Sequence, residues 1–279
     1  MTTALTREDA EKLVASIGIP PRPAVVIAIQ DEKSKPEPDM RIIAEVIGRD
    51  VGIAAALLKT VNSPFFSLPR LVQSIPHAIN LLGLNRVATL VNSLALKTSL
   101  NAHGIERFWD QSARIALVST WLAGKFGHDT DTAHLFGLFR DAGIPLMMKK
   151  FPSYKDTLRR ADAAGADFVA IEEAAHGVNH TQVGAIIARN WHLADDIRQA
   201  IAGHHDADLF NLAETPSAVK NLVAVSHLAG HLENLAHRGS GDNEWLRNHD
   251  ALSAWLMIGD EDLDDMAREA STLLLETGL

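Results

Sequence analysis

Signals that start and stop helices recur along the whole chain, and no segment alternates apolar and polar residues over the length of a strand. Ser74 and Asn179 each precede an apolar stretch of helical period, as helix N-caps do. Asp260 opens a third stretch whose first turn is acidic, and Thr215-Pro216 is expected to start a long helix with Thr215 as its N-cap. These patterns predict an all-α fold.

Two shorter elements are predicted in the same way. Thr6 begins an N-terminal helix that Gly18 ends. The segment HLFGLFRDAG (134–143) is expected to be a short, largely buried helix with Asp141 in its last turn and Gly143 as its stop signal.

The composition narrows the class of protein. The chain has 279 residues, of which 47% are hydrophobic and 5% aromatic, which favours helix packing over a β-sandwich. No apolar run approaches the roughly 18 residues that span a bilayer, and the N-terminus lacks a secretory signal, so we expect a cytoplasmic protein without a membrane partner. Cysteine is absent, which excludes thiolate metal sites. A net charge of −9 with only short basic runs disfavours nucleic acid as a partner.

The distribution of helix start and stop signals divides the chain into three regions. The segment NAHGIE (101–106) separates two predicted helical lobes. We expect an N-terminal helical lobe over 1–103, a second lobe over 104–238, and a C-terminal helical tail over 239–279 that packs on the bundle. The three regions together are also compatible with one structural unit.

Asp141 is the residue whose neighbours carry most of the chemical information. A catalytic metal site needs about three protein ligands and an open position for water, and Asp141 with His180, His204 and His205 supplies enough ligand atoms if the fold brings them together. Arg140 precedes Asp141, remains protonated and cannot bind a cation. We therefore expect Arg140 to pair with Asp141 and to oppose metal binding, although its guanidinium is also suited to a phosphate.

The histidines have a structural interpretation as well. His176 and His180 lie four residues apart, a spacing that is more often incidental than metal-binding. The adjacent His204 and His205 would diverge by about 100° on a regular helix, which suits a helix end beside a site. Spacing alone leaves both interpretations of these two residues open.

The first lobe resembles the HDOD family of bacterial signalling domains. The segments that carry the resemblance are GIPPRPAVV (18–26), IIAEVIGRDVGIAAALLKTVNSPFFSLPR (42–70) and SIPHAINLLGLNRVATLVNSLAL (74–96). The second lobe is similar to the part of HDOD proteins that is related to HD-superfamily phosphohydrolases, through HLFGLFRDAG (134–143), GVNHTQVGAIIARNW (177–191) and IRQAIAGHHD (197–206). The likeness covers about residues 15–235 and implies a helical bundle of two lobes, the second with the HD phosphohydrolase fold.

The same resemblance implies a decayed metal site. In the HD superfamily, histidines and aspartates from several helices hold one or two divalent metals that activate water against a phosphoester. The His-Asp pair of the superfamily falls on Arg140-Asp141, the histidine of an earlier helix falls near Gln111 or Ser112, and the final aspartate falls within 227–230, where no carboxylate is present. The first metal therefore loses most of its ligands.

Part of a second metal site persists in this comparison. His180, His204 and His205 match the histidines that hold the second metal in two-metal members. With Asp141 they are the candidate metal ligands, and with Arg140 they form the predicted residual pocket. We expect no tightly bound cofactor, and the residual ligands allow a divalent metal at partial occupancy.

The residues and the resemblance together predict a non-catalytic bacterial signal-transduction or scaffold protein with a degenerate HD-type metal site. One alternative is a metal-dependent phosphohydrolase, such as a phosphodiesterase, that uses the residual Asp/His site. The other is a pseudoenzyme that senses a phosphate-containing ligand. Other signalling proteins are the expected partners, and a phosphate-containing small molecule is a further candidate.

The segment from Asn62 to Arg70 is a candidate partner surface, presented by Asn62, Phe65, Phe66 and Arg70. The structural alternative is that the two phenylalanines wedge this loop into the core. We favour the structural alternative.

Overall fold

The computed structural model describes residues 16–277 except 67, 69, 101–104 and 165–166, and all regular structure in these residues is helical. The prediction of an all-α fold is confirmed. The predicted helix after Thr6 lies outside the described residues, as does most of the predicted boundary at 101–106. None of the helices in the described ranges is both long and apolar enough to cross a bilayer.

The N-terminal elements are α2 (Ala24–Lys33), α3 (Met40–Arg49), α4 (Val51–Val61), the 3-10 helix η1 (Pro64–Phe66), α5 (Ile75–Leu82) and α6 (Leu84–Ser99). The central elements are α7 (Glu106–Phe126), α8 (Thr130–Phe139), α9 (Gly143–Lys150), α10 (Tyr154–Ala164), α11 (Phe168–His176), α12 (His180–Asn190), α13 (Asp195–Gly203) and α14 (Ser217–Arg238). The chain ends with α15 (Asn243–Leu256) and α16 (Asp260–Thr277).

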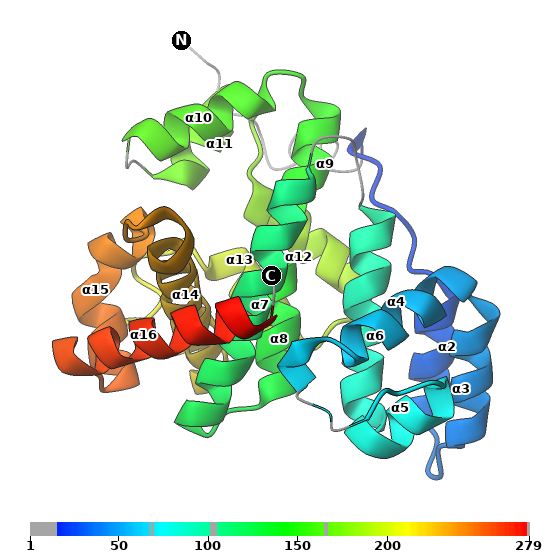
Figure 1. The fold of residues 1–279 in the computed structure, drawn as a ribbon. Helices are drawn as coiled ribbons and strands as arrows, with labels where there is room; N and C mark the ends of the chain where they lie inside the picture. The colour runs from blue at the N-terminus through cyan, green and yellow to red at the C-terminus, as the bar shows by residue number, and fades with distance from the viewer. Residues whose placement is uncertain (1–15, 67, 69, 101–104, 165–166, 278–279) are drawn as a thin grey trace.

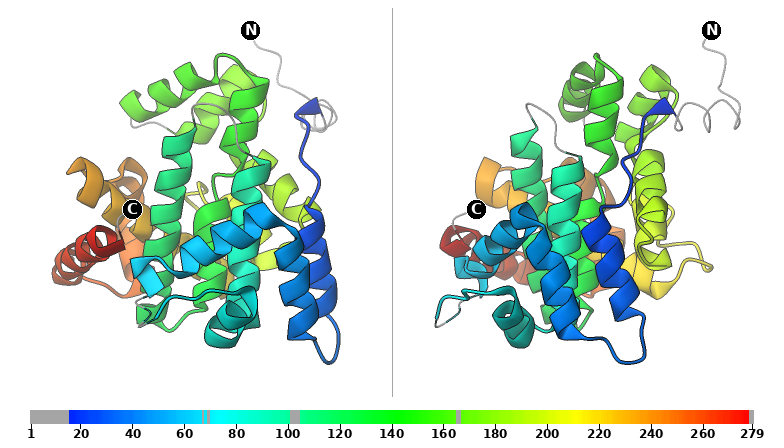
Figure 2. Two further views of the ribbon diagram at one scale, coloured as in Figure 1. Left: turned by 45° about the vertical axis from the view of Figure 1, so that its right-hand side comes forward. Right: turned by 90° about the vertical axis from the view of Figure 1, so that its right-hand side faces the viewer.

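The N-terminal and C-terminal helices lie on opposite sides of a central bundle. In Figure 1, α2 to α5 lie at the right and α15 and α16 at the left, with α7, α8 and α14 between them. Helix α6 packs against α2 and α4 and also against α8, so it joins the N-terminal helices to the bundle (Figure 2). One apolar cluster of buried residues extends from Ile17 to Val223, so the core is continuous across both predicted lobes.

A second apolar cluster holds the C-terminal helices in place. It is built from buried residues of α7, α14, α15 and α16, with Trp245 and Leu228 fully enclosed. Phe65 of η1 packs against this cluster, and α16 contacts η1. The C-terminal helices therefore contact both the central bundle and the N-terminal part of the chain.

Several predicted caps form as expected. The Ser74 side chain accepts a hydrogen bond from the His77 amide at the start of α5. Asn179 and Gln182 form a reciprocal capping box at the start of α12. Because this cap fixes the first turn, it also fixes the direction in which His180, the first residue of α12, leaves the helix.

Two predicted helix boundaries are wrong. Helix α14 begins at Ser217, so Pro216 rather than Thr215 is the N-cap; Pro216 has an extended ψ of 142°, and its carbonyl accepts the first helical bonds. Gly143 is not a stop signal, because it is the first residue of α9. Its lack of a side chain has a different reason: a Cβ at Gly143 would collide with the backbone carbonyl of His180. This close approach of α9 to α12 brings Asp141 near His180.

His134 provides a test of the packing between α7 and α8. Its Nδ1 is hydrogen-bonded to Thr120 Oγ1 at 3.1 Å, and burial, assisted by the charge of Arg86, lowers the pKa of His134 to about 4. The unfolded chain takes up this proton near pH 6.5, so it binds more protons than the folded chain between pH 6.5 and 4. The free energy of unfolding should therefore fall as the pH decreases through this window.

Between pH 7 and pH 4.5, the free energy of unfolding should decrease in both proteins, but the decrease should be about 1–3 kcal/mol smaller in His134→Gln than in the wild type. Urea denaturation at the two pH values measures this difference. His77→Gln, at an exposed histidine of α5, is the matched control and should retain the wild-type pH dependence. Identical pH dependence in His134→Gln and the wild type would contradict the role assigned to His134.

Candidate metal centre

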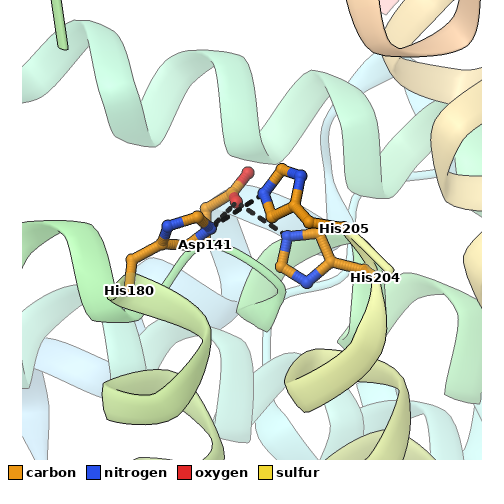
Figure 3. Close-up of side chains that lie close together, drawn as sticks. All are labelled: Asp141, His180, His204 and His205. Atoms are coloured by element: carbon orange, nitrogen blue, oxygen red, sulfur yellow. Dashed lines mark hydrogen bonds and ion pairs between the residues drawn. The ribbon is translucent and has the colours of Figure 1, made fainter. Parts of the chain in front are cut away.

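Four side chains from three separate segments meet at one point in the central bundle. Asp141 lies in the turn between α8 and α9, His180 begins α12, and His204 and His205 follow α13. Figure 3 shows the four side chains directed toward one another, and one ligand atom from each lies within 4.8 Å of the others. The structure thus brings together all four residues that the sequence analysis selected as candidate ligands.

The end of α13 is held by α14. His204 occupies the C-cap position of α13, and its carbonyl oxygen accepts a hydrogen bond from His227 Nε2 at 2.6 Å. Because the helix ends here, His205 does not continue the helical rotation, and the rings of His204 and His205 lie 4.1 Å apart at the same site. The helix end therefore allows two adjacent residues to reach one point.

Each of the three histidines donates its Nδ1 proton away from the centre. His180 donates to Glu172 Oε2 at 2.6 Å, His204 donates to the carbonyl oxygen of Ile201 at 2.9 Å, and His205 donates to Glu244. Acceptors that have no proton of their own fix the ring tautomers in this way. All three Nε2 atoms are therefore available as ligands on the side that faces Asp141.

The atoms at the centre are close but poorly matched to one another. Asp141 Oδ1 lies 3.5 Å from His180 Nε2 and 3.4 Å from His204 Nε2, and the Nε2 atoms of His180 and His205 are 3.0 Å apart. His204 Nε2 is buried and has no hydrogen-bond partner among the described residues. Imidazole lone pairs that face one another repel unless a cation lies between them. Three imidazole nitrogens and one carboxylate oxygen are a donor set that suits Zn²⁺.

The pKa values of these groups also indicate a requirement for one cation. Burial alone would lower the pKa of His180, but its bonds to Asp141 and Glu172 outweigh burial and raise the pKa to about 9. Burial and the neighbouring His205 lower the pKa of His204 to about 4. Burial would raise the pKa of Asp141, but Arg140 and the histidines hold it well below its usual range. A proton on His180 therefore supplies the positive charge when no metal ion does.

Arg140 lies on the other side of Asp141. Its Nε donates to Asp141 Oδ2 at 3.0 Å, and one terminal nitrogen donates to the carbonyl and hydroxyl oxygens of Ser226, each at 3.0 Å. A Cβ at Gly230 would lie 3.3 Å from the other terminal nitrogen, so a larger residue there would crowd the guanidinium. The guanidinium thus spans from Asp141 to the 226–230 stretch of α14, where the resemblance places the missing final aspartate.

The resemblance places the histidine of an earlier helix near Gln111 or Ser112, and both of these side chains are engaged in other hydrogen bonds. Gln111 donates to the buried carboxylate of Glu233 at 3.1 Å, and Ser112 Oγ donates to the Phe108 carbonyl at 2.9 Å. His176 likewise lies apart from the cluster, because it is hydrogen-bonded to Thr157 and stacked on Phe151.

Three residues that support the centre were missed by the sequence analysis. Glu172 is fully buried on α11 and accepts hydrogen bonds from the amide and ring of His180 and from Tyr154. Glu172 and Glu173 form a pair that is typical of a solvated helix face, so the sequence gives no indication of its role. Tyr154 is the only tyrosine in the chain, which was a usable signal. Glu244 lies in the C-terminal tail, where no motif drew attention to it.

A cavity of about 670 Å³ opens beside the centre, and Arg140, Asp141 and His205 contribute to its lining. The charged residues that line it are Arg107, Arg140, Arg159, Arg238, Arg247, Asp141, Asp242 and Glu244. Five arginines thus face three carboxylates in a chain whose net charge is −9. The remaining wall combines polar and apolar side chains, and Phe108, Met148 and Phe168 are among the apolar ones.

The predicted partner surface in the N-terminal part of the chain has clear structural roles. Asn62 accepts from the amide of Val72 at 2.7 Å and donates to the Val72 carbonyl at 2.8 Å, which closes the loop. Phe65 and Phe66 are half-buried, one against each apolar cluster, and Arg70 is exposed. Partner binding by these residues stays a prediction.

Comparisons with known proteins identify the family of this chain. The HDOD domain matches residues 19–207, so the chain belongs to the HDOD family. Similar solved structures include a candidate phosphohydrolase from Shewanella amazonensis SB2B, with a TM-score of 0.73, 19% identity and coverage of 96% of this chain and 95% of that one. An HDOD domain protein of unknown function from Geobacter sulfurreducens has a TM-score of 0.72, 22% identity and coverage of 98% and 97%. At these identities the likeness shows the fold alone.

Curated relatives are longer than this chain. A protein of Treponema pallidum (strain Nichols) is 26% identical over 224 residues, which are 77% of this chain and 43% of that protein. Protein YuxH of Bacillus subtilis (strain 168) is 34% identical over 67 residues, which are 24% of this chain and 16% of that protein. The chain therefore spans less than half the length of the curated relatives it matches.

Glu172 offers a test of how the centre is oriented. Because Glu172 fixes the tautomer and direction of His180, we expect Glu172→Gln to weaken Zn²⁺ binding by about 10–100-fold, measured by competition with a chromophoric chelator. Glu45→Gln changes an exposed carboxylate of α3 that pairs with Arg49, and it should leave the affinity unchanged. Equal affinities in the two variants would show that Glu172 does not orient a metal ligand.

Proposed function

We propose that the chain is a non-catalytic signal-transduction domain that binds protein partners, and that its residual Asp/His cluster holds a single divalent metal ion in a structural capacity. The observation that carries this proposal is the position of the Arg140 guanidinium, which pairs with Asp141 and reaches Ser226. A permanent cation takes the place of the first metal of the HD superfamily and would repel a second ion beside the residual ligands.

The ligand number supports the same proposal. Asp141, His180, His204 and His205 form a set of four protein ligands, which is typical of structural zinc sites, whereas catalytic sites keep one position open for water. A bound ion would neutralise the facing lone pairs and tie the α8–α9 turn to α12 and to the end of α13. Its chemistry would be charge neutralisation and cross-linking of these segments rather than activation of water.

The test combines metal stoichiometry with an assay of turnover. We expect the full chain, purified without chelators, to bind one equivalent of Zn²⁺ and to give a tetrahedral visible spectrum with Co²⁺, both of which Asp141→Ala should remove. His77→Ala is the control at an exposed histidine. No hydrolysis of a generic phosphodiester above background is expected. Metal-stimulated hydrolysis that Asp141→Ala abolishes would identify an enzyme instead.

A second function, binding of a phosphate-containing small molecule without hydrolysis, is favoured by the arginines that line the cavity. Guanidinium groups form strong bidentate bonds with phosphates, and the apolar side chains of the wall would accommodate the organic part of such a ligand. A nucleoside triphosphate is a suitable probe because it offers both parts.

We expect a saturating nucleoside triphosphate to raise the melting temperature by a few degrees. The double variant Arg238→Ala/Arg247→Ala should reduce this shift, whereas Arg198→Ala, at an arginine paired with Asp195 on α13 away from the cavity, should retain it. A shift of the same size in all variants would argue against binding in the cavity.

A further inference from the structure

A carboxylate from the C-terminal tail is built into the candidate metal centre. Glu244 lies in the first turn of α15, beyond the residues that the HDOD domain matches. Its side chain is only 17% exposed, one oxygen accepts the Nδ1 proton of His205, and the other lies 3.9 Å from His227 Nδ1. The tail thus supplies the acceptor that orients one of the four candidate ligands.

The start of α15 holds Glu244 in a defined position. Asp242 caps α15 by accepting from the amides of Glu244 and Trp245, each at 3.0 Å. Asp242 is itself attached to α14, because its amide donates to His231 at 3.2 Å and its carboxylate accepts from Asn234 at 3.1 Å. Glu244 is therefore presented to His205 by a capped helix end with several attachments to α14.

The tail continues as α15 and α16 (residues 243–277), here called the C-terminal helix pair; each of the two helices packs against α14 and contributes buried residues to the second apolar cluster. Helix α16 also contacts η1, and Phe65 of η1 packs against the same cluster. If this C-terminal helix pair were held less firmly, its contact with η1 would change, and η1 is part of the loop that is the predicted partner surface.

We propose that Glu244 is a positioning residue of the metal centre and that ion binding is thereby coupled to docking of the C-terminal helix pair. The inference rests on the proposed metal site. Glu244 acts through His205, whose Nε2 it directs toward Asp141 and whose basicity it increases. Coupling of this kind is reciprocal. If docking of the C-terminal helix pair increases the affinity for the ion, the bound ion must increase the equilibrium constant for docking by the same factor.

The experiment measures both sides of this coupling on the full chain. Zn²⁺ affinity, measured by chelator competition, should be about 10–100-fold weaker in Glu244→Ala, with Glu244→Gln between this variant and the wild type because the amide oxygen still accepts a hydrogen bond. Asp265→Ala removes an exposed α16 carboxylate that pairs with Arg268 of the same helix, and it should bind Zn²⁺ like the wild type.

Hydrogen exchange supplies the second readout. Zn²⁺ should slow exchange of the amides in residues 243–277 in the wild type and in Asp265→Ala by a similar factor, and should not slow it in Glu244→Ala. If Glu244→Ala does not fold, Glu244→Gln carries both measurements.

The outcomes separate the inference from the proposed function. Equal Zn²⁺ affinity in the wild type and both Glu244 variants, or Zn²⁺ protection that is confined to the ligand segments, would overturn the coupling and leave the metal site intact. A wild-type chain that binds no Zn²⁺ would overturn the proposed metal site and the coupling with it.

Discussion

The ion pair between Arg140 and Asp141 is the interaction on which the chemistry of this site depends. Asp141 has two carboxylate oxygens, and they face different groups: Oδ2 accepts from the Arg140 guanidinium, and Oδ1 faces the Nε2 atoms of His180 and His204. One side of the carboxylate is thereby committed to a charge that cannot be exchanged. The other side remains suited to a single exchangeable cation, either a proton or a metal ion. In the proposed function, this division separates the position that Arg140 fills from the donors that would hold one metal ion.

The surrounding helices preserve the ligand geometry through groups outside the cluster. Glu172, Glu244 and the Ile201 carbonyl each accept an Nδ1 proton, so all three histidines present Nε2 to the centre. Burying a carboxylate such as Glu172 is unfavourable unless its hydrogen bonds are satisfied, and Tyr154 and His180 satisfy them. These acceptors direct all three rings at one point, which is the arrangement that the proposed metal ion would need.

Much of the fold could be predicted because its signals are local. Capping residues such as Ser74 and Asn179 act on amides two or three residues away, and their pattern gave the correct fold class. The start of α14 was predicted one residue too early. Whether Pro216 is the N-cap or the first helical residue depends on its ψ angle, which the sequence does not give. Gly143 was assigned a local role as a stop signal, whereas its actual constraint is the passage of α12 against it. Contacts between segments that are distant in the chain do not produce a periodic pattern in the sequence.

For the site, the sequence by itself determined the types of candidate ligand and the permanent charge of Arg140, where the resemblance places a histidine of the superfamily. Only the tertiary structure decided that Asp141, His180, His204 and His205 converge, that the guanidinium extends to Ser226, and that Glu172 and Glu244 orient the rings. The physical reason is that the type of ligand atom and the charge of an arginine belong to individual residues, whereas distances, pKa shifts and proton positions depend on how separate helices pack. Glu244 of the tail reaches His205 of the candidate metal centre because α15 is docked against α14.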